Sequence, residues 1–403
     1  MKILFISTWF PYPPSQGSKI RAFHLIQALA RKHQVGLVSF LEPGIEKENV
    51  EAVEKICSFV KTIPRDPYQE DPRKALLGFF SPRPSVVTAI YSAEMADLVR
   101  KTALEWGADC VAAQQFVMAP YAMKINGVPK ILDLDFLMAR VLYEDFIAER
   151  RWLARMRKWM AYKKFEHYEK SLCEQFDGCF VVSDEDAAGI QRMIARGEER
   201  VKVIPNGVDL SHYRLGVSEP AANTLIYNGS LTYAANFDAM EYFLREIFPL
   251  ILRQIPETRL RITGKTDGMA LDRLNLNAQV EFTGYLDDIR EAVSGSWASV
   301  IPLRIGGGTR LKILEAMALG TAVVSTSKGA EGLLLESEKH LLIADDPAEF
   351  AAQTVRVLQS PELRFDLVGN AAQLVRERYN WEDIGYDFCL AVEEIAARSR
   401  SHA

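Results

Sequence analysis

The chain has 403 residues, of which 48% are hydrophobic and 25% are charged, and its formal net charge at pH 7 is −5. That length is too great for one compact core and predicts two domains of roughly 200 residues each. The composition excludes a disordered chain, and the acidic balance argues against nucleic acid as the main partner. No apolar run in the sequence is long enough to span a bilayer.

Cysteine usage and the first residues bear on the cellular compartment. The five cysteines, Cys57, Cys110, Cys173, Cys179 and Cys389, include no CxxC pair, and their odd number leaves one unpaired in any disulfide scheme. We therefore expect buried thiols in a reducing cytosol, without zinc and without any other cofactor. The opening run KILFIST fits a first β-strand better than a signal peptide, because it is short and prolines follow it.

In chain order, short apolar runs alternate with helical patterns, which is typical of parallel α/β sheets. The first set of predicted strands covers residues 2–8, 34–40, 57–64, 109–115, 129–135 and 177–183, with a helix around Ile20 to Arg31. The second set covers residues 223–230, 258–265, 279–285, 297–303 and 321–326. These sets predict two doubly wound, Rossmann-like parallel sheets joined by a linker from Pro205 to Ala222. Because ligands bind beyond the carboxyl ends of such strands, we expect the two domains to face each other across a cleft.

Gly17 follows the first predicted strand, in the loop PYPPSQGSKIRAF just before a helix. A glycine at this place lets a ligand approach the backbone N–H groups without meeting a side chain. A simple loop glycine is the alternative. Lys19 and Arg21 come next, and these two cations could contact the ligand or only coat the helix.

Asp133 and Asp135, in KILDLDF, end a predicted strand of the first half. Two carboxylates spaced by two share one face of a strand and could hold a divalent ion. Because the phosphate-binding signals all lie in the second half of the chain, we interpret these aspartates as groups that orient or deprotonate a substrate hydroxyl. Capping of the next helix explains them equally well.

The segment from Arg140 to Lys170 mixes arginines and lysines with aromatic residues that include Trp152, Trp159 and Tyr162. Basic and aromatic residues at helical spacing suit anionic lipid headgroups, which predicts contact with a membrane surface. Acidic residues interrupt the run, however, and aromatic stripes on helices usually belong to the core. The sequence leaves both interpretations open.

The stretch from Val300 to Thr326, VIPLRIGGGTRLKILEAMALGTAVVST, combines a strand, a glycine turn, a charged helix and a second strand. Thr309 is the expected N-cap of the helix, and Gly320 is expected to end it. Free N–H groups at such a helix start favour phosphate. Lys312 and Glu315 share one helical face, which offers a cation to a phosphate and a carboxylate to sugar hydroxyls. A solvated ion pair on a plain βαβ unit is the alternative.

Three segments resemble one known family. GGGTRLKILEAMALGTAVVSTSKGAEGL is similar to the nucleotide-binding segment of the retaining group 1, or family 4, glycosyltransferases. VKVIPNGVDLSHY resembles the passage from acceptor domain to donor domain in that family, and LIYNGSLTYAANFDAMEYF resembles the opening of its donor domain. The resemblance implies the GT-B fold, with an acceptor-binding domain over residues 1–205, a nucleotide-sugar donor domain over 206–375 and a final helix, 376–403, that returns to the first domain.

The same resemblance implies a hexosyltransferase-type reaction. A sugar would pass from a nucleoside diphosphate sugar to a hydroxyl of a lipid-linked or polysaccharide precursor, with retention of configuration and without a metal. The predicted donor-binding residues are Gly17, Asn228, Gly229, Gly307, Gly308, Thr309, Arg310, Lys312 and Glu315, and the predicted catalytic residues are Asp133, Asp135 and Lys312. The family carries two glutamates eight positions apart, and this chain keeps only Glu315, because Gly307 stands in place of the first. We therefore expect backbone N–H groups of the glycine turn to take over part of the sugar recognition.

Two other functions fit the same fold. A nucleotide-sugar epimerase would bind a similar donor but needs several acid and base groups, and only the two aspartates offer themselves. A non-catalytic nucleotide-sugar-binding protein is the second alternative, because the first glutamate is lost. The expected setting is bacterial exopolysaccharide biosynthesis in the cytoplasm, with peripheral contact at the inner face of the membrane.

Overall fold

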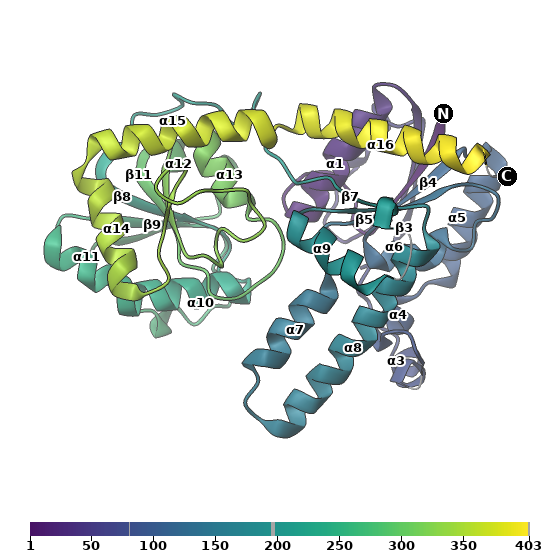
Figure 1. Ribbon diagram of the computed structural model, residues 1–403, viewed down its shortest axis with the longest axis horizontal. Coiled ribbons are helices and arrows are strands. Elements are labelled where there is room, and N and C mark those ends of the chain that lie inside the picture. The colour runs from purple at the N-terminus through teal and green to yellow at the C-terminus, as the bar shows by residue number, and fades with distance from the viewer. Residues whose placement is uncertain (80, 195–197, 402–403) are drawn as a thin grey trace. The chain divides into compact units, whose positions relative to one another are not determined.

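The computed structural model describes residues 1–79, 81–194 and 198–401. The chain forms two compact units. The first comprises Met1–Asn206, Gly307–Thr309 and the C-terminal segment from Glu382, and the second comprises Gly207–Gly306 and Arg310–Trp381. Each unit holds one sheet of parallel strands with helices packed against it (Figure 1). The prediction of two doubly wound parallel sheets is confirmed.

The sheet of the first unit has the strand order β3-β2-β1-β4-β5-β6-β7. Its strands are β1 (Lys2–Ser7), β2 (Gln34–Leu41), β3 (Phe59–Pro64), β4 (Cys110–Gln114), β5 (Lys130–Leu134), β6 (Gly178–Val181) and β7 (Val201–Val203). Strand β1, in the interior of the sheet, is buried from Ile3 to Ser7. Because neither face of this strand meets water, its sequence is a continuous apolar run and does not alternate.

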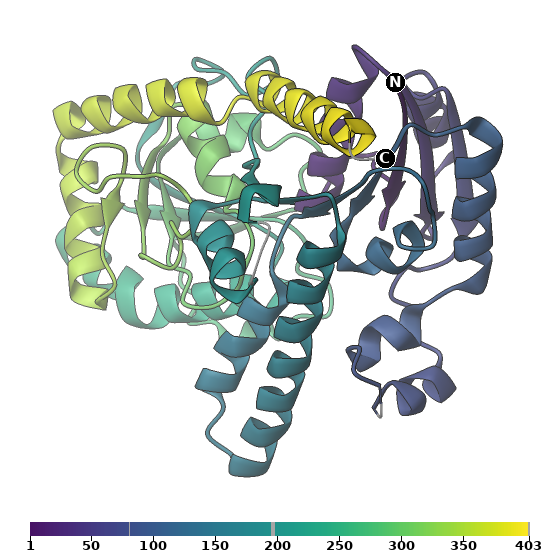
Figure 2. The ribbon, with the colours of Figure 1, turned by 45° about the vertical axis from the view of Figure 1, so that its right-hand side comes forward.

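Helices cover this sheet and connect its strands. They are α1 (Gly17–Ala30), α2 (Lys47–Glu54), α3 (Pro72–Phe79), α4 (Ser85–Ile90), α5 (Ala93–Trp106), α6 (Gln115–Ala122), α7 (Met138–Ala148), α8 (Trp152–Gln175), α9 (Asp184–Met193), the 3-10 turn η1 (Glu198–Arg200) and α16 (Trp381–Ser401). Two of them, α7 and α8, form a helical hairpin that runs away from the sheet of this unit (Figure 2).

The last helix, α16, is an integral part of the first unit although it follows the whole second unit in sequence. A Cβ atom on Gly385 would lie 2.6 Å from Cβ of Ala28 in α1, so the Ala28 methyl packs directly against the backbone of α16. The rings of Phe388 and Phe180 in β6 have centroids 5.3 Å apart. These contacts bury the apolar side of α16 against α1 and the sheet.

The second unit has the strand order β10-β9-β8-β11-β12-β13, again with parallel strands. Its strands are β8 (Ala221–Asn228), β9 (Arg259–Thr263), β10 (Val280–Gly284), β11 (Ser296–Ile301), β12 (Ala322–Ser325) and β13 (Leu342–Ile343). Its helical segments are α10 (Ala234–Tyr242), the π-helical turn η2 (Phe243–Ile247), α11 (Phe248–Gln254), the 3-10 turn η3 (Leu271–Arg273), α12 (Arg290–Ser294), α13 (Leu311–Ala318), α14 (Pro347–Gln359) and α15 (Pro361–Arg378).

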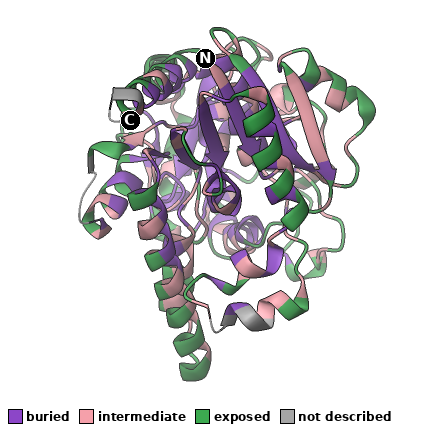
Figure 3. Cartoon of the chain, turned by 90° about the vertical axis from the view of Figure 1, so that its right-hand side faces the viewer, coloured by how far each residue is buried: buried purple, intermediate pink, exposed green. Residues whose placement is uncertain are grey.

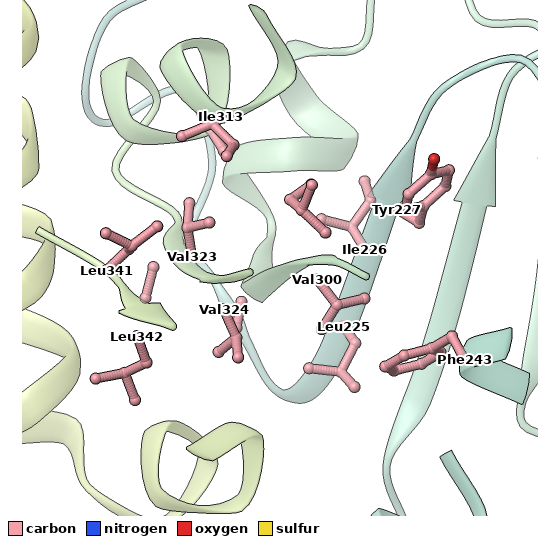
Figure 4. Close-up of a cluster of buried hydrophobic side chains, with 14 of the residues drawn as sticks. Leu225, Ile226, Tyr227, Phe243, Val300, Ile313, Val323, Val324, Leu341 and Leu342 are labelled. Carbon is pink, nitrogen blue, oxygen red and sulfur yellow. The ribbon is translucent and has the colours of Figure 1, made fainter. Parts of the chain in front are cut away.

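The core of the second unit lies between these strands and helices. Leu225 and Ile226 of β8, Val300 of β11 and Val324 of β12 are fully buried, and Ile313 of α13 packs over the strands (Figure 4). The burial of Ile313 fixes the rotation of α13. Its polar residues are thereby placed toward the carboxyl end of β8.

Two sequence-based expectations concern membranes and thiols. Within residues 1–79, 81–194 and 198–401, no helix is both long enough and apolar enough to cross a membrane. All five cysteines are buried and free, as the sequence predicts.

Candidate functional site

A cluster of polar side chains lies at the carboxyl ends of β8 and β11 in the second unit. The strand order reverses here, since β9 and β10 extend the sheet beyond β8 while β12 and β13 extend it beyond β11. The loops of doubly wound sheets diverge at such a point and leave room for a ligand. Asn228 is the last residue of β8, and the glycine turn 306–308 separates β11 from α13.

The glycine turn enters α13 in a way that the sequence does not predict. Gly306 and Gly308 have φ values of +104° and +80°, in the left-handed region that favours glycine. The guanidinium of Arg310 donates to the carbonyl of Gly306 at 2.6 Å and holds the turn closed. The prediction that Thr309 caps α13 is wrong, because the N-cap residue of the helix is Arg310, without a side-chain capping bond. The predicted end is confirmed, since α13 stops just before Gly320, whose φ is +79°.

The ammonium of Lys312 is fixed by two side chains from β8 and α10. Its Nζ atom lies 3.0 Å from the hydroxyl of Tyr227 and 3.0 Å from Oδ1 of Asn236. The Tyr227 ring centroid is 4.2 Å from Nζ, which adds a cation–π attraction. The Tyr227 hydroxyl in turn donates to Oδ1 of Asn236 at 2.7 Å. Lys312 is therefore held in a network of its own and is not the solvated partner of Glu315.

Gly229 leaves room for this ammonium beside the backbone. A Cβ atom at Gly229 would lie 2.7 Å from Nζ of Lys312 and 3.0 Å from Nδ2 of Asn236. No side chain could stand there without displacing the lysine. The backbone N–H of Gly229 is engaged, because it donates to the carbonyl of Thr263 at 3.1 Å.

Glu315, one turn further along α13, has different partners. Nδ2 of Asn228 donates to its Oε2 atom at 3.2 Å, and the Tyr213 hydroxyl also hydrogen-bonds the carboxylate. Oδ1 of Asn228 is buried and finds no hydrogen-bond partner in the described part of the chain. A buried acceptor that lacks a donor favours a ligand hydroxyl or N–H at this place.

Burial shifts both charged groups of α13 toward neutrality. The pKa of Lys312 is lowered to about 7, mainly because burial removes water from the ammonium and further because Arg310 is positive. Burial raises the pKa of Glu315 to about 7, against the opposing influence of Lys312. An anion beside Lys312 would favour the charged ammonium, so the electrostatics of the site suit a phosphate.

The first unit carries a second polar cluster at the carboxyl ends of β1, β4 and β5. The strand order reverses between β1 and β4. Ser7, at the end of β1, donates to Oε1 of Gln114, at the end of β4, at 2.7 Å. The next residue, Gln115, has a φ of +65°, which is uncommon for a residue with a side chain. Such backbone strain is concentrated at functional sites, so Gln115 joins the candidate residues.

Asp133 is occupied by a buried ion pair with Arg21 of α1. Nη2 of Arg21 lies 2.6 Å from Oδ1 of Asp133, and Nε lies 2.8 Å from Oδ2. Nη1 donates to the carbonyl of Ile204 at 2.9 Å and to Oδ1 of Asn206 at 3.0 Å. Through Arg21, Asp133 therefore links α1 and β5 to residues 204–206, which follow β7.

Asp135 keeps one carboxylate oxygen without a partner. The Ser18 hydroxyl donates to its Oδ2 atom, and Nε2 of Gln115 donates to the same oxygen at 3.0 Å. Burial is the main cause that raises the pKa of Asp135 to about 6. Oδ1 of Asp135 and Oε1 of Gln115 are both buried, and neither has a hydrogen-bond partner among the residues described. Two adjacent acceptors of this kind suit a ligand that donates, such as a hydroxyl.

Gly17 is the first residue of α1 and is exposed next to Ser18, so it borders the Asp135 cluster. Lys19 is buried and forms an ion pair with Glu42 of the next loop. The alternative that Lys19 and Arg21 coat the helix surface is therefore wrong, because both side chains are buried and paired.

The structure thus gathers the predicted residues into two groups. Asn228, Gly229, Arg310, Lys312 and Glu315 lie together in the second unit, at the point where its strand order reverses. Asp135 lies near Gly17 in the first unit, whereas the Asp133 carboxylate pairs with Arg21. Gly307 and Gly308 belong to the glycine turn, and Thr309 follows it.

Sequence reasoning missed six residues of these clusters: Ser18, Gln114, Gln115, Tyr213, Tyr227 and Asn236. The Gln114–Gln115 pair carries a signal, because two amides end an otherwise apolar strand in DCVAAQQ. The tyrosines and Asn236 carry none, since their contacts to α13 depend on how the unit folds.

The carboxylates of Asp133 and Asp135 have separate partners: Arg21 pairs with Asp133, and Ser18 and Gln115 hydrogen-bond Asp135. One group of three metal-type ligands occurs elsewhere in the described chain, formed by His33, Cys389 and Glu393. Nε2 of His33 lies 3.0 Å from Oε1 of Glu393 and 3.5 Å from Sγ of Cys389.

Comparisons with known proteins match both halves of the chain to the same kind of enzyme. A family model described as Glycosyltransferase Family 4 matches residues 15–212, and one described as Glycosyl transferases group 1 matches residues 222–360. An uncharacterized 44.6 kDa protein in the cps region of Klebsiella pneumoniae is 20% identical over 402 residues, which cover 94% of this chain and 96% of that protein.

Solved structures agree on the fold. Sucrose-phosphate synthase from Thermosynechococcus elongatus superimposes with a TM-score of 0.71 at 19% identity, covering 99% of this chain and 100% of that one. Anabaena HepE in complex with UDP superimposes with a TM-score of 0.70 at 15% identity, covering 98% and 100%. These likenesses confirm the predicted GT-B fold class.

Proposed function

The chain belongs to the group 1 glycosyltransferases, and we propose that it moves a sugar from a nucleoside diphosphate sugar to a hydroxyl acceptor. One observation carries the proposal. Lys312 and Glu315 stand on one face of α13 at the point where the strand order reverses, and each is held by its own set of side chains. A half-buried cation and a half-buried carboxylate side by side match the phosphate and the sugar hydroxyls of a nucleotide sugar.

In this proposal the donor binds along the start of α13. Lys312 contacts the diphosphate, the N–H groups at the helix start add partial positive charge, and Glu315 accepts hydrogen bonds from ribose hydroxyls. Arg310 braces the glycine turn through the carbonyl of Gly306. When the bond to the sugar breaks, negative charge grows on the leaving diphosphate, and Lys312 stabilises it. Anabaena HepE, of the same fold, has structures with UDP and with UDP-glucose, which supports a nucleotide donor.

The acceptor hydroxyl is assigned to the cluster in the first unit. Oδ1 of Asp135 and Oε1 of Gln115 accept its hydrogen bonds and orient it, while Ser18 holds the carboxylate in place. We propose a lipid-linked or polysaccharide precursor as the acceptor and retention of the anomeric configuration. The Klebsiella relative encoded in a cps region supports a role in surface polysaccharide.

The test is a panel of nucleotide sugars, read first by thermal shift and then by product analysis with added acceptors. The proposal expects one donor to raise the melting temperature and to yield a glycoside of unchanged anomeric configuration, in EDTA as in buffer. An epimerised donor would contradict transfer in favour of an epimerase. Binding without turnover in the presence of every acceptor class would favour a non-catalytic binding protein.

A further inference from the structure

The hairpin of α7 and α8 leaves the core of the first unit. No residue between Ala139 and Phe165 is buried, whereas the base of the hairpin is packed. The burial colours show the change along the hairpin, from purple at its base to green at its far end (Figure 3). We call residues 140–164 the arm. The interpretation that the aromatic residues of this segment belong to the core holds for Phe165 and Tyr168 and in part for Tyr162, which packs against the core, but not for Trp152 and Trp159.

Exposed apolar side chains form one face of α8 in the arm: Trp152, Leu153, Met156, Trp159 and Met160. Their exposed fractions run from 38% for Met160 to 72% for Trp152. The spacing i, i+1, i+4, i+7 and i+8 places all five on the same side of the helix. Tyr143 and Ile147 of α7 are also exposed, at 44% and 55%. Single exposed apolar residues need no explanation, but a continuous face of this size marks an interaction surface.

The same stretch is strongly basic. Residues 150–164 contain no acidic residue and seven basic ones: Arg150, Arg151, Arg155, Arg157, Lys158, Lys163 and Lys164. Helical geometry puts Arg155 and Arg157 on either side of the apolar face, each about 100° from its centre. Long basic side chains in that position can hold their charge at headgroup level while the apolar face goes deeper.

We propose that the arm docks on an anionic lipid bilayer, with the apolar face of α8 inserted among the acyl chains and the flanking arginines at the headgroups. The chain as a whole is negative, so its attraction to such a surface must come from local basic segments, and docking through the arm gives the molecule one orientation. A second copy of the chain is a poor occupant of this face, because pairing two arms would bring their positive charges together.

Hydrogen bonds and ring packing at its base hold the arm on the core of the first unit. The buried carboxylate of Glu169 in α8 accepts hydrogen bonds from the backbone N–H groups of Met138, at 2.7 Å, and Ala139, at 3.3 Å, and so caps the start of α7. The rings of Phe165 and Phe116 pack edge to face at 5.3 Å. Because α7 begins three residues after Asp135, the anchor is continuous with the proposed acceptor cluster. The connection between the arm and an acceptor site rests on the proposed function, whereas docking of the arm on a bilayer does not.

The test is sedimentation of the full chain with phosphatidylcholine vesicles that contain or lack phosphatidylglycerol. Three double variants are compared: Trp152→Ser with Trp159→Ser removes apolar anchors, Arg155→Gln with Arg157→Gln removes charge, and Leu104→Ser with Phe365→Ser is the control. The control residues are the most exposed apolar side chains outside the arm among the residues whose burial is described, at 79% and 77%. Circular dichroism and thermal unfolding check that all variants fold.

The proposal expects the parent and the control to bind phosphatidylglycerol vesicles, and each arm variant to bind about tenfold or more weakly. About 1 M salt, where the Debye length is roughly 3 Å, should weaken the parent strongly and the arginine variant little. Equal sedimentation of parent and arm variants, or no binding by the parent, would overturn it. Dimerisation of the parent that the tryptophan changes abolish would assign the face to a second copy instead.

A second measurement does not depend on polar substitutions. Brominated lipids quench tryptophans that reach the acyl chains, and the parent has six tryptophans in all. Trp152→Phe with Trp159→Phe should keep vesicle binding and lose the quenching, and persistent quenching would contradict insertion by this face. Lys312→Ala should bind vesicles like the parent, so failure of the donor site and failure of the anchor are separable.

Discussion

At the residue scale, contacts separate two aspartates that look alike in the sequence. Asp133 is saturated by Arg21, whereas Asp135 retains an unpartnered oxygen next to Gln115. The DLD pattern could not distinguish them, because their roles depend on Arg21 and Ser18, which lie more than a hundred positions away in sequence. The face-sharing argument for Lys312 and Glu315 needed only helical periodicity, which is why the sequence could predict it.

Replacing Asp133 should therefore affect mainly stability, whereas replacing Asp135 should affect mainly the rate of transfer. Asp133→Ala leaves the buried Arg21 without its partner and should lower the free energy of unfolding by about 3–5 kcal/mol. Asp135→Asn keeps the shape and should leave that free energy nearly unchanged while it slows transfer. Urea unfolding and initial rates on both variants measure the contrast. A stable Asp133→Ala, or an unaffected rate in Asp135→Asn, would contradict the assignment.

Gly229→Ala tests whether the position of the Lys312 ammonium matters, without removing any charge. The added methyl would lie 2.7 Å from Nζ of Lys312, so the lysine must move away from Tyr227 and Asn236. Nucleotide affinity should fall about tenfold or more, which corresponds to the loss of a charged contact. The matched control is Gly369→Ala in α15, where a Cβ meets nothing within 4 Å. Calorimetry that finds the two variants equal in affinity would refute the role of Gly229.

The pH dependence of kcat/KM should be bell-shaped, since this parameter reports groups of the free enzyme. Burial raises the pKa of Asp135 to about 6, so its carboxylate forms only above that pH, and activity should rise there. The pKa of Lys312 is lowered to about 7, so the ammonium is lost above that pH and activity should fall. Burial raises the pKa of Glu315 to about 7, so its carboxylate also forms only as the pH rises, and its titration contributes to the acid limb and not to the alkaline one.

Lys312→Arg checks the assignment of that upper limb. A guanidinium stays charged across the whole range, so the alkaline limb should move to higher pH. An acid limb should remain, because the carboxyl groups of Asp135 and Glu315 are unchanged. An alkaline limb that stays where the parent has it would show that another group controls it.

At the scale of elements, the sequence predicted long buried strands and missed short edge strands. Eleven predicted strands are present, and β7 and β13 are absent from the prediction because they have three and two residues. Both lie at the edge of a sheet, where a short strand limits unwanted pairing with other chains and leaves little apolar pattern. The arm was ambiguous for another reason. Periodicity shows that a face is apolar but not whether anything covers it.

Docking of α16 on the first unit depends on the absence of a side chain at Gly385. A methyl there would lie 2.6 Å from Cβ of Ala28, and neither atom can rotate away. Gly385→Ala should therefore lower the free energy of unfolding by about 1–3 kcal/mol through overpacking. Gly189→Ala in α9, where a Cβ meets nothing, should raise it by up to about 1 kcal/mol. Thermal unfolding of both variants decides, and a stabilised Gly385→Ala would contradict close packing.

At the scale of the whole molecule, the sequence predicted two doubly wound sheets because each half repeats the strand-helix alternation. Pattern alone predicted a linker from Pro205 to Ala222, and the chain passes from the first compact unit to the second inside it, between Asn206 and Gly207. Family resemblance supplied the kind of donor, while the loss of the first glutamate at Gly307 left the sugar undetermined. The net charge of the chain does not predict the charge of each surface, because an acidic chain carries a basic arm.

The central claim is that α13 binds the diphosphate and ribose of a nucleotide sugar. Calorimetric titration of the parent, Lys312→Ala and Glu315→Ala with the donor selected by the panel tests it most directly, with Lys339→Ala, an exposed lysine of the same unit, as the control. Each of the two α13 variants should lose about 1.5–3 kcal/mol of binding free energy, and the control should lose none. Binding by both α13 variants as tight as that of the parent would contradict the account.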